Sequence, residues 1–255
     1  MGRIELRYCT PYLRDGLSGT AKSTVAPVAG VSTLTLDTVL LNTMVPTKVP
    51  VGARFTVAEE TAVGGVQPMH TVTARTLDST GLITQSITFT PAMGAGATYT
   101  VEAPLTFKPQ LLYVKIGDGD LKYSENDQYH YDLDRDQLDV VRQGADVPLD
   151  VSLNFTWVYT AAGTLDPPSP IEAIKGIGAA DEWVSSDPDG CQPYSVDLIV
   201  DYNPPCATTK EETYYFNLFR AEKRDHDFKT ANVSVNGKCN IKAPTITRGA
   251  PSPAL

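Results

Sequence analysis

A run of alternating apolar residues between positions 147 and 159 constrains the fold of this chain more than any other stretch. Every second residue is apolar and the residues between are mostly polar; the apolar set is Val147, Leu149, Val151, Leu153, Phe155, Trp157 and Tyr159. Side chains of a β-strand point alternately to its two faces, so the pattern predicts a strand with one buried and one wet face. Such strands belong to antiparallel sheets. We therefore expect a mainly β protein, an antiparallel β-sandwich or barrel with residues 147–159 as its central strand.

Further alternating stretches and one helix signal complete this expectation. Strands are predicted over 3–13, 110–116, 121–124, 128–133, 194–202, 214–219 and within 228–241. Ser169, Pro170 and Glu172 have the spacing of a capping box with proline at the first helical position. Gly176 and Gly178 follow closely, so the predicted helix is short.

Composition divides the chain into domains. Residues 18–106 are rich in Thr, Val, Ala and Gly and hold only nine charged residues. Short alternating runs separated by turn signals recur through this block, at 32–36, 53–58, 71–76, 86–90 and 98–102. That spacing predicts a small inserted surface β-domain at 18–106. Residues 1–17 and 107–248 then form the main β-sandwich domain, and the Pro-rich stretch 249–255 a loose C-terminal tail.

Negative charge is concentrated in one segment. The formal charge of the chain is −9, and residues 118–150 hold ten acidic residues against three basic ones. This balance argues against a protein that binds nucleic acid by neutralising phosphates, but it suits a surface that DNA slides past. We expect an exposed acidic loop or hairpin here, with Asp118, Asp120, Glu125, Asp127, Asp132, Asp134, Asp136 and Asp139.

The residues offer no coherent active site. The three histidines lie in distant segments, and neither a G-x-S-x-G motif nor a phosphate-binding loop is present. Asp132, Asp134 and Asp136 match the first ligand positions of a calcium loop, but Gln137 and Gln143 stand where that loop requires Gly and Glu. We therefore expect no enzyme, no cofactor and no metal site.

The cysteines and the N-terminal residues bear on the compartment. Four cysteines occur without a C-x-x-C motif, and the opening residues 1–5 lack an apolar core. We expect no signal peptide and reduced thiols, with Cys191 and Cys206 as the pair to bridge if any does. No uncharged apolar run reaches the length of a membrane span, so no membrane insertion is expected.

Several motifs after residue 108 resemble those of the tail tube (major tail) proteins of tailed bacteriophages. The stretch 117–125, Gly-Asp-Gly-Asp-Leu-Lys-Tyr-Ser-Glu, resembles a hairpin of that family, and 168–176 resembles the short helix beside its β-sandwich. The segments 187–206, 219–222 and 233–239 follow the same pattern. The resemblance covers 3–17 and about 108–248, and residues 18–106 more distantly resemble the surface β-domains of phage virion proteins.

The resemblance implies a structural virion protein of the phage tail, assembled in the host cytoplasm. Subunits of the family form hexameric rings, and each subunit contributes strands to a continuous inner β-barrel. Stacked rings form the tube through which phage DNA is ejected. The implied partners are further copies of the chain, the tape-measure, tail terminator and tail-tip proteins, and DNA in transient, non-specific passage.

A DNA conduit is expected to be acidic inside, because a basic wall would bind phosphate. The polar faces of 147–159 and 194–202 carry acids and neutral groups but no base. The expected lumen-facing residues are therefore Asp150, Ser152, Asn154, Asp197 and Asp201. The acidic stretch 118–146 is expected to form the long loop or hairpin that reaches the neighbouring ring.

Two other classes of function remain open at this stage. Another virion component, such as a neck, capsid or decoration protein, has the same β-rich character. A carbohydrate-binding β-sandwich module is compatible with the many aromatic residues, although aromatic residues at alternating strand positions more commonly fill a core or a subunit contact. Fold-level resemblance does not by itself decide between these functions.

Overall fold

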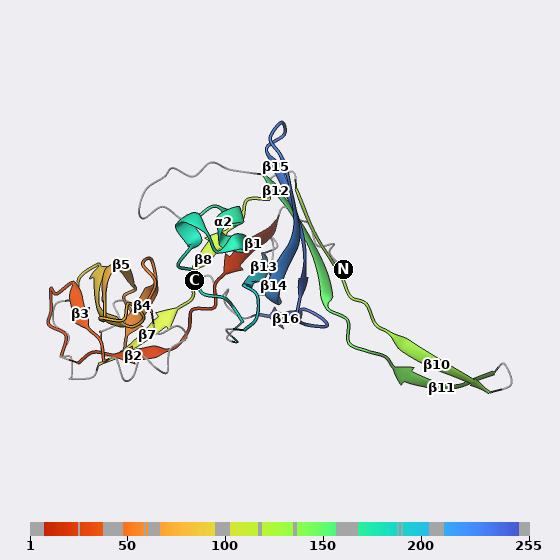
Figure 1. Cartoon of the computed structure of the whole chain (residues 1–255), viewed down its shortest axis with the longest axis horizontal. Helices are drawn as coiled ribbons and strands as arrows, with labels where there is room; N and C mark the ends of the chain where they lie inside the picture. The colour runs from red at the N-terminus through yellow and green to blue at the C-terminus, as the bar shows by residue number, and fades with distance from the viewer. Residues whose placement is uncertain are drawn as a thin grey trace. The chain divides into compact units, whose positions relative to one another are not determined.

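The computed structural model describes residues 8–24, 26–37, 48–58, 60, 67–94, 103–116, 119–134, 137–156, 168–187, 189, 191–203 and 212–249. The chain is mainly β with antiparallel sheets, as predicted (Figure 1). It forms two compact units, each built from more than one stretch of sequence. We call residues 1–13, 112–159 and 191–255 the sheet unit, and residues 14–111 and 160–190 the barrel unit.

The sheet unit contains an eight-stranded sheet and a separate two-stranded hairpin. The order in the large sheet is β8-β1-β13-β14-β15-β12-β9, with β16 pairing to β14. Its strands are β1 (Cys9–Arg14), β8 (Leu111–Tyr113), β9 (Asp120–Ser124), β12 (Leu149–Thr156), β13 (Val196–Tyr202), β14 (Glu212–Asp227), β15 (Asn232–Cys239) and β16 (Thr245–Arg248). The hairpin consists of β10 (Tyr129–Asp134) and β11 (Gln137–Gln143), which pair antiparallel.

Strand β12 confirms the predicted alternation, because every second residue from Leu149 to Phe155 is buried. Residues 157–159 of the predicted strand lie outside the described residues. The predicted central position was wrong: β12 lies between β15 and β9, and β9 ends the sheet. Regular alternation reports that one face is buried, and it says nothing of how many strands lie on either side.

Strand β14 is the central strand, and it allows the sheet to fold back on itself. Its first half pairs with β13 and β16, and its second half pairs with β15. Between the halves Leu218 has a φ of 58°, a left-handed conformation that is uncommon for a non-glycine residue. The ring of Tyr123 on β9 lies 5.2 Å from that of Phe216 on β14, although β15 and β12 separate the two strands in the sheet. The β9 end of the sheet therefore faces the first half of β14, as in a sandwich.

The barrel unit is organised by a six-stranded antiparallel sheet that closes on itself. The order is β2-β7-β4-β5-β6-β3, formed by β2 (Thr20–Lys22), β3 (Thr33–Thr35), β4 (Arg54–Val57), β5 (His70–Leu77), β6 (Thr84–Thr90) and β7 (Pro104–Lys108). A bridge between Ser23 and Leu36 joins the two end strands, and the amide of Asp37 donates to the carbonyl of Lys22 at 2.9 Å. A closed barrel leaves no sheet edge to pair with another chain. The predicted strand 98–102 lies outside the described residues.

Apolar side chains fill the barrel. The ring of Phe55 lies 5.3 Å from that of Phe89 and 5.5 Å from that of Phe107, between ring centres. Leu34, Leu36, Val57, Val72, Ile87 and Leu105 are buried in the same core. The alternation that predicted these strands is thus explained by a shared interior.

The predicted helix is present as α2 (Pro170–Lys175) with the predicted cap. The Ser169 hydroxyl accepts a hydrogen bond from the Glu172 amide at 3.3 Å, and a Glu172 carboxylate oxygen accepts one from the Ser169 amide at 2.8 Å. Gly176 ends the helix with a φ of 62°, a left-handed conformation that glycine adopts without strain.

The helix segment belongs to a different unit from the one the sequence suggested. Residues 160–190 group with the barrel, whereas composition placed them with the main β-sandwich domain. Val184 packs against the barrel core, and Glu182 forms an ion pair with Arg75 of β5. These contacts join stretches more than 100 residues apart, so composition along the chain could not reveal them.

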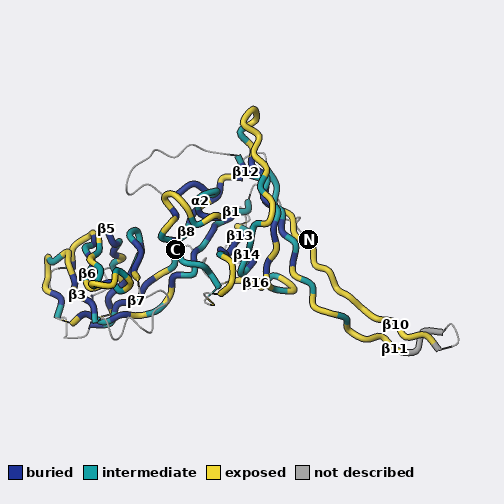
Figure 2. Tube along the Cα trace, viewed as in Figure 1, coloured by how far each residue is buried: buried dark blue, intermediate teal, exposed yellow. Residues whose placement is uncertain are grey.

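Burial follows this architecture (Figure 2). Buried positions alternate along the barrel strands and β12, whereas the described residues of β10 and β11 are exposed. Among the described residues, no helix has the length and apolar character needed to cross a membrane.

Candidate functional site

The polar face of β12 holds three of the five predicted lumen residues. Asp150, Ser152 and Asn154 are partly exposed, and they alternate with buried apolar residues of the same strand. Asp150 also accepts a hydrogen bond from the Asn126 side chain at 3.1 Å. These three residues therefore lie on a face open to solvent in the single chain.

The other two predicted lumen residues are buried, so the expectation of a wet face on β13 was wrong. Asp197 is 6% exposed and Asp201 is 3% exposed. A carboxylate oxygen of Asp197 accepts a hydrogen bond from the Leu218 amide at 3.0 Å, and one of Asp201 accepts from the Thr213 hydroxyl at 2.8 Å. Alternating acids in this strand mark buried carboxylates that are hydrogen-bonded within the fold.

The expected absence of basic groups on the lumen face was also wrong. In the sheet, Asp150 lies opposite Lys238 of β15, and Ser152 lies opposite Lys122 of β9. Residues directly opposite in an antiparallel pair share a face, so both lysines belong to the face of Asp150. Sheet order decides which side chains are neighbours across strands, and the order was not available from the sequence.

Two basic residues on this face form ion pairs with acids. Lys122 lies 2.7 Å from a carboxylate oxygen of Asp120 on the same strand, and Lys223 of β14 lies 2.7 Å from Asp225. Asn154 lies opposite Ser234, in a neutral strip between these ion pairs. The polar sheet face is therefore a mixed surface and not an acidic one.

The acidic segment forms a hairpin. Three of the predicted acids belong to its strands: Asp132 and Asp134 lie in β10, and Asp139 lies in β11. Asp120 belongs to β9 of the large sheet, and Glu125 and Asp127 lie between β9 and the hairpin. Asp118 and Asp136 lie outside the described residues. Asp132 pairs with Arg142 across the hairpin at 3.0 Å. Both side chains are more than half exposed, so the pair adds little stability.

One face of the β10–β11 hairpin is apolar and uncovered. Tyr129, Tyr131 and Leu133 follow each other at alternate positions, and Val141 lies opposite Tyr131. Their exposed fractions lie between 48% and 63%. A two-stranded hairpin is marginally stable alone in water, so this face requires a cover. The acids of this segment were predicted from the sequence, whereas its exposed apolar face was not, although Tyr129, Tyr131 and Leu133 alternate in the sequence.

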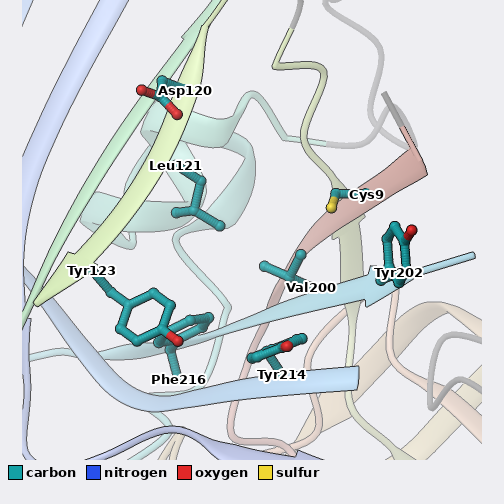
Figure 3. A pocket seen from close by; sticks show the side chains of 8 residues that line it. All are labelled: Cys9, Asp120, Leu121, Tyr123, Val200, Tyr202, Tyr214 and Phe216. Atoms are coloured by element: carbon teal, nitrogen blue, oxygen red, sulfur yellow. The ribbon is translucent and has the colours of Figure 1, made fainter. Parts of the chain in front are cut away.

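An aromatic cleft opens between β9 and the strands β1, β13 and β14 of the large sheet (Figure 3). Its volume is about 300 Å³, and the residues that line it are Cys9, Asp120, Leu121, Tyr123, Val200, Tyr202, Tyr214 and Phe216. The Tyr214 hydroxyl donates to Glu212 at 3.1 Å, and Glu212 pairs with Arg248 at 2.9 Å. Burial, and then this hydrogen bond, raise the pKa of Tyr214. The cleft thus combines apolar walls with a fixed polar end.

Two buried titratable sites lie in the described part of the barrel unit. The His70 imidazole is fully buried, with Nδ1 at 2.8 Å from the Pro91 carbonyl and Nε2 at 2.5 Å from the Glu60 carboxylate. Since the Pro91 carbonyl only accepts, Nδ1 carries a hydrogen. The second oxygen of Glu60 accepts from the Gly94 amide at 2.7 Å. Glu60 is 4% exposed, so the cluster lies in the interior, and its hydrogen bonds connect residues 60, 70, 91 and 94 of the barrel unit.

The second buried group is Asp15, which is 1% exposed. One of its oxygens accepts from the amides of Gln110 at 2.7 Å and Leu17 at 3.3 Å. Its other oxygen has no hydrogen-bond partner within the described part of the chain. Burial raises the pKa of Asp15 to about 7, although these amide hydrogen bonds oppose the shift.

The described residues contain neither a metal-ligand cluster nor a disulfide. The described residues contain no group of three or more His, Cys, Asp or Glu placed to hold a metal ion. Asp136 of the tested calcium loop lies outside them, and the side chain of Asp134 is not described. Cys9, Cys191 and Cys239 are not in disulfides, and Cys206 also lies outside the described residues.

The described geometry thus offers three surfaces in the sheet unit: the mixed polar sheet face, the apolar face of the hairpin, and the aromatic cleft. Comparison of the chain with protein-family models, with curated proteins and with solved structures found no match.

Proposed function

We propose that this chain is a structural subunit that assembles with copies of itself into stacked rings, forming the tail tube of a phage. One observation carries self-assembly: the uncovered apolar face of the β10–β11 hairpin. Tyr129, Tyr131, Leu133 and Val141 expose it to water, and no other strand pairs with the hairpin among the described residues. Contact with a second copy would remove this face from water at roughly 25 cal/mol per Å².

Open strand edges support the same proposal. Strand β9 pairs with β12 on one side, and the described residues place no strand on its other side. An unpaired edge presents backbone donors and acceptors that a neighbouring chain can bind. In the proposed tube, such edges join adjacent subunits into a continuous inner barrel of the tail-tube type.

The mixed sheet face is the proposed wall of the DNA channel. Asp150, Ser152 and Asn154 remain in this role, whereas the burial of Asp197 and Asp201 removes those two residues from it. A wall of compensated ion pairs and neutral amides gives passing phosphates no net basic patch to bind. The proposal therefore predicts weak, non-specific contact with DNA.

Electron microscopy and sedimentation of the purified chain test the proposal. We expect hollow tubes or six-fold rings from the natural sequence. The double variant Tyr129→Ser, Tyr131→Ser should sediment as a monomer with unchanged thermal unfolding, because both side chains lie outside the cores. His130→Ser changes the opposite face of the same strand and should assemble normally.

Other outcomes point to other functions. Closed shells or discrete small rings without tubes would indicate another virion component, such as a capsid, neck or decoration protein. A stable monomer that binds glycans would favour a carbohydrate-binding module, for which the tyrosines of the aromatic cleft provide a platform. Either outcome would contradict the proposed tube.

A further inference from the structure

A single aromatic side chain projects from the turn between β14 and β15. Phe228 is 77% exposed, the highest exposure among the large apolar residues of the described chain. Its ring stacks on His226 with 6.4 Å between ring centres and 18° between planes. An aromatic residue at such exposure loses water contact only when another molecule covers it.

The turn that carries Phe228 is held in one conformation. One carboxylate oxygen of Asp227 accepts from the Lys229 amide at 2.9 Å, and the other accepts from the Thr230 hydroxyl at 2.7 Å. The hydrogen bond from the Thr230 hydroxyl has the larger effect and the one from the Lys229 amide the smaller, and both lower the pKa of Asp227. A side chain on a fixed turn loses less conformational freedom on binding than one on a mobile loop.

The aromatic cleft matches this side chain in size and chemistry. A closed apolar cavity of about 150 Å³ is large enough to bind benzene. The cleft has about twice that volume and is open, so it can admit a phenyl ring together with part of its turn. Tyr123, Tyr214 and Phe216 in its walls favour edge-to-face or offset contacts with an inserted ring.

The turn has one acidic neighbour that can pair with a base at the cleft. Asp227, the last residue of β14, directly precedes Phe228. Arg248 lies near the Tyr214 end of the cleft, where its charge acts to lower the pKa of Tyr214. Its guanidinium is largely exposed and uses one nitrogen for Glu212, so further donors remain for an incoming carboxylate.

We propose that Phe228 of one copy inserts into the aromatic cleft of a second copy. The inference deepens the proposed function and rests on it, because it requires self-assembly. Phe228 is exposed in the single chain and therefore does not fill its own cleft. Because the turn and the cleft are different surfaces of one unit, the same contact can repeat from copy to copy around a ring or along a filament.

Cys9 provides a direct test, because it lines the cleft and is not in a disulfide. A tagged chain with Phe228→Cys and Cys9→Ser is mixed with the untagged natural chain and treated with diamide. Diamide takes up the two electrons and two protons released when two thiols join, and it is reduced to the hydrazine. We expect a tagged–untagged dimer on a non-reducing gel, with position 228 linked to Cys9 in the peptide map.

A matched control uses another exposed turn. Leu82→Cys in the tagged Cys9→Ser background places a thiol on an exposed turn of the barrel unit and should give no link to Cys9. Cys191 is also exposed and competes for the new thiol. Linkage of position 228 to Cys191 instead of Cys9 would overturn the inference.

A second measurement does not depend on thiols. Phe228→Ser should weaken self-association roughly tenfold or more, as expected for the loss of a buried aromatic anchor, and Phe228→Tyr should largely retain it. Both variants should keep the natural melting temperature. Equal self-association of Phe228→Ser and the natural chain would refute the contact.

The two proposals fail in distinguishable ways. Tubes in the micrographs without a link between position 228 and Cys9 would end this inference and leave the proposed function standing. A specific link in small oligomers without rings or tubes would support the contact and contradict the tube.

Discussion

The two units treat their sheet edges in opposite ways. The barrel joins its end strands at Ser23 and Leu36, and it encloses Glu60, His70 and Asp15. The sheet unit ends at β9 without a further strand in the described residues, and it exposes the apolar face of the β10–β11 hairpin. The barrel closes its sheet within one chain, whereas the sheet unit leaves a strand edge and an apolar face exposed in the described residues. Stability and assembly should therefore be separable by mutation.

The largest effect is expected from Glu60→Ala. The change removes the partner of His70 Nε2 and of the Gly94 amide in a buried site. Breaking one side of a buried pair costs about 3–5 kcal/mol, so denaturant unfolding of the barrel should shift by that amount. Assembly, measured by sedimentation under conditions in which the barrel stays folded, should not change. A shift below about 1 kcal/mol would show that water or a neighbouring group compensates the loss.

Asp15 makes barrel stability depend on pH. Its folded pKa of about 7 lies above the unfolded value near 3.9, so the protonated form is favoured by folding. This contribution is complete below about pH 4 and is lost as the pH rises through 7. Between pH 5 and 9 the barrel should lose about 3 kcal/mol from this group.

The variant Asp15→Asn isolates this effect. An amide oxygen can accept the hydrogen bonds of the Gln110 and Leu17 amides, and it carries no charge to bury. Denaturant unfolding of the variant should be flatter over pH 5–9 and should exceed natural stability at pH 9. Parallel pH profiles of the two proteins would contradict the assignment.

A smaller effect is expected from the ion pair between Arg75 and Glu182, which joins β5 to the helix segment. Glu182 accepts from both terminal nitrogens of Arg75 and from the Val51 amide at 2.7 Å. Glu182→Gln should cost about 2 kcal/mol, because charge-assisted bonds in a partly buried site are lost. Asp120→Asn breaks the exposed pair with Lys122 on the sheet unit and should leave unfolding unchanged.

The smallest effect is expected at the helix cap. Ser169→Ala removes the acceptor for the Glu172 amide and should destabilise the barrel unit by about 1 kcal/mol. Ser169→Thr retains a hydroxyl and should restore most of the loss. Equal melting temperatures for all three proteins would mean that the helix contributes nothing to the barrel unit.

Local signals in the sequence were reliable, and signals that depend on neighbours were not. The buried face of β12 and the cap at Ser169 each depend on residues a few positions apart, and both were predicted. The burial of Asp197 depends on the Leu218 amide of the adjacent strand, and the position of Lys238 beside Asp150 depends on sheet order. Neither can be read from one strand.

The site was predictable to the same limited extent. A loop or hairpin was expected in the acidic segment, and its acids were located. Its exposed apolar face was not predicted, because the high density of acidic residues is the stronger signal there. The cleft joins β1, β9, β13 and β14, which span more than 200 residues. Only the fold of the sheet brings these strands to one place.

The chain enters the barrel strands at Asp15 and leaves them at Gln110, and the backbone and side chain of Asp15 bind Gln110 directly. A segment whose two ends already touch costs little loop entropy when its length changes. Foreign peptides or whole folded modules with adjacent termini could therefore replace residues 18–106 through short connections, provided that Val184 and Glu182 are given new partners. This position could therefore serve as an insertion site at which a foreign folded module is displayed on the proposed assembly.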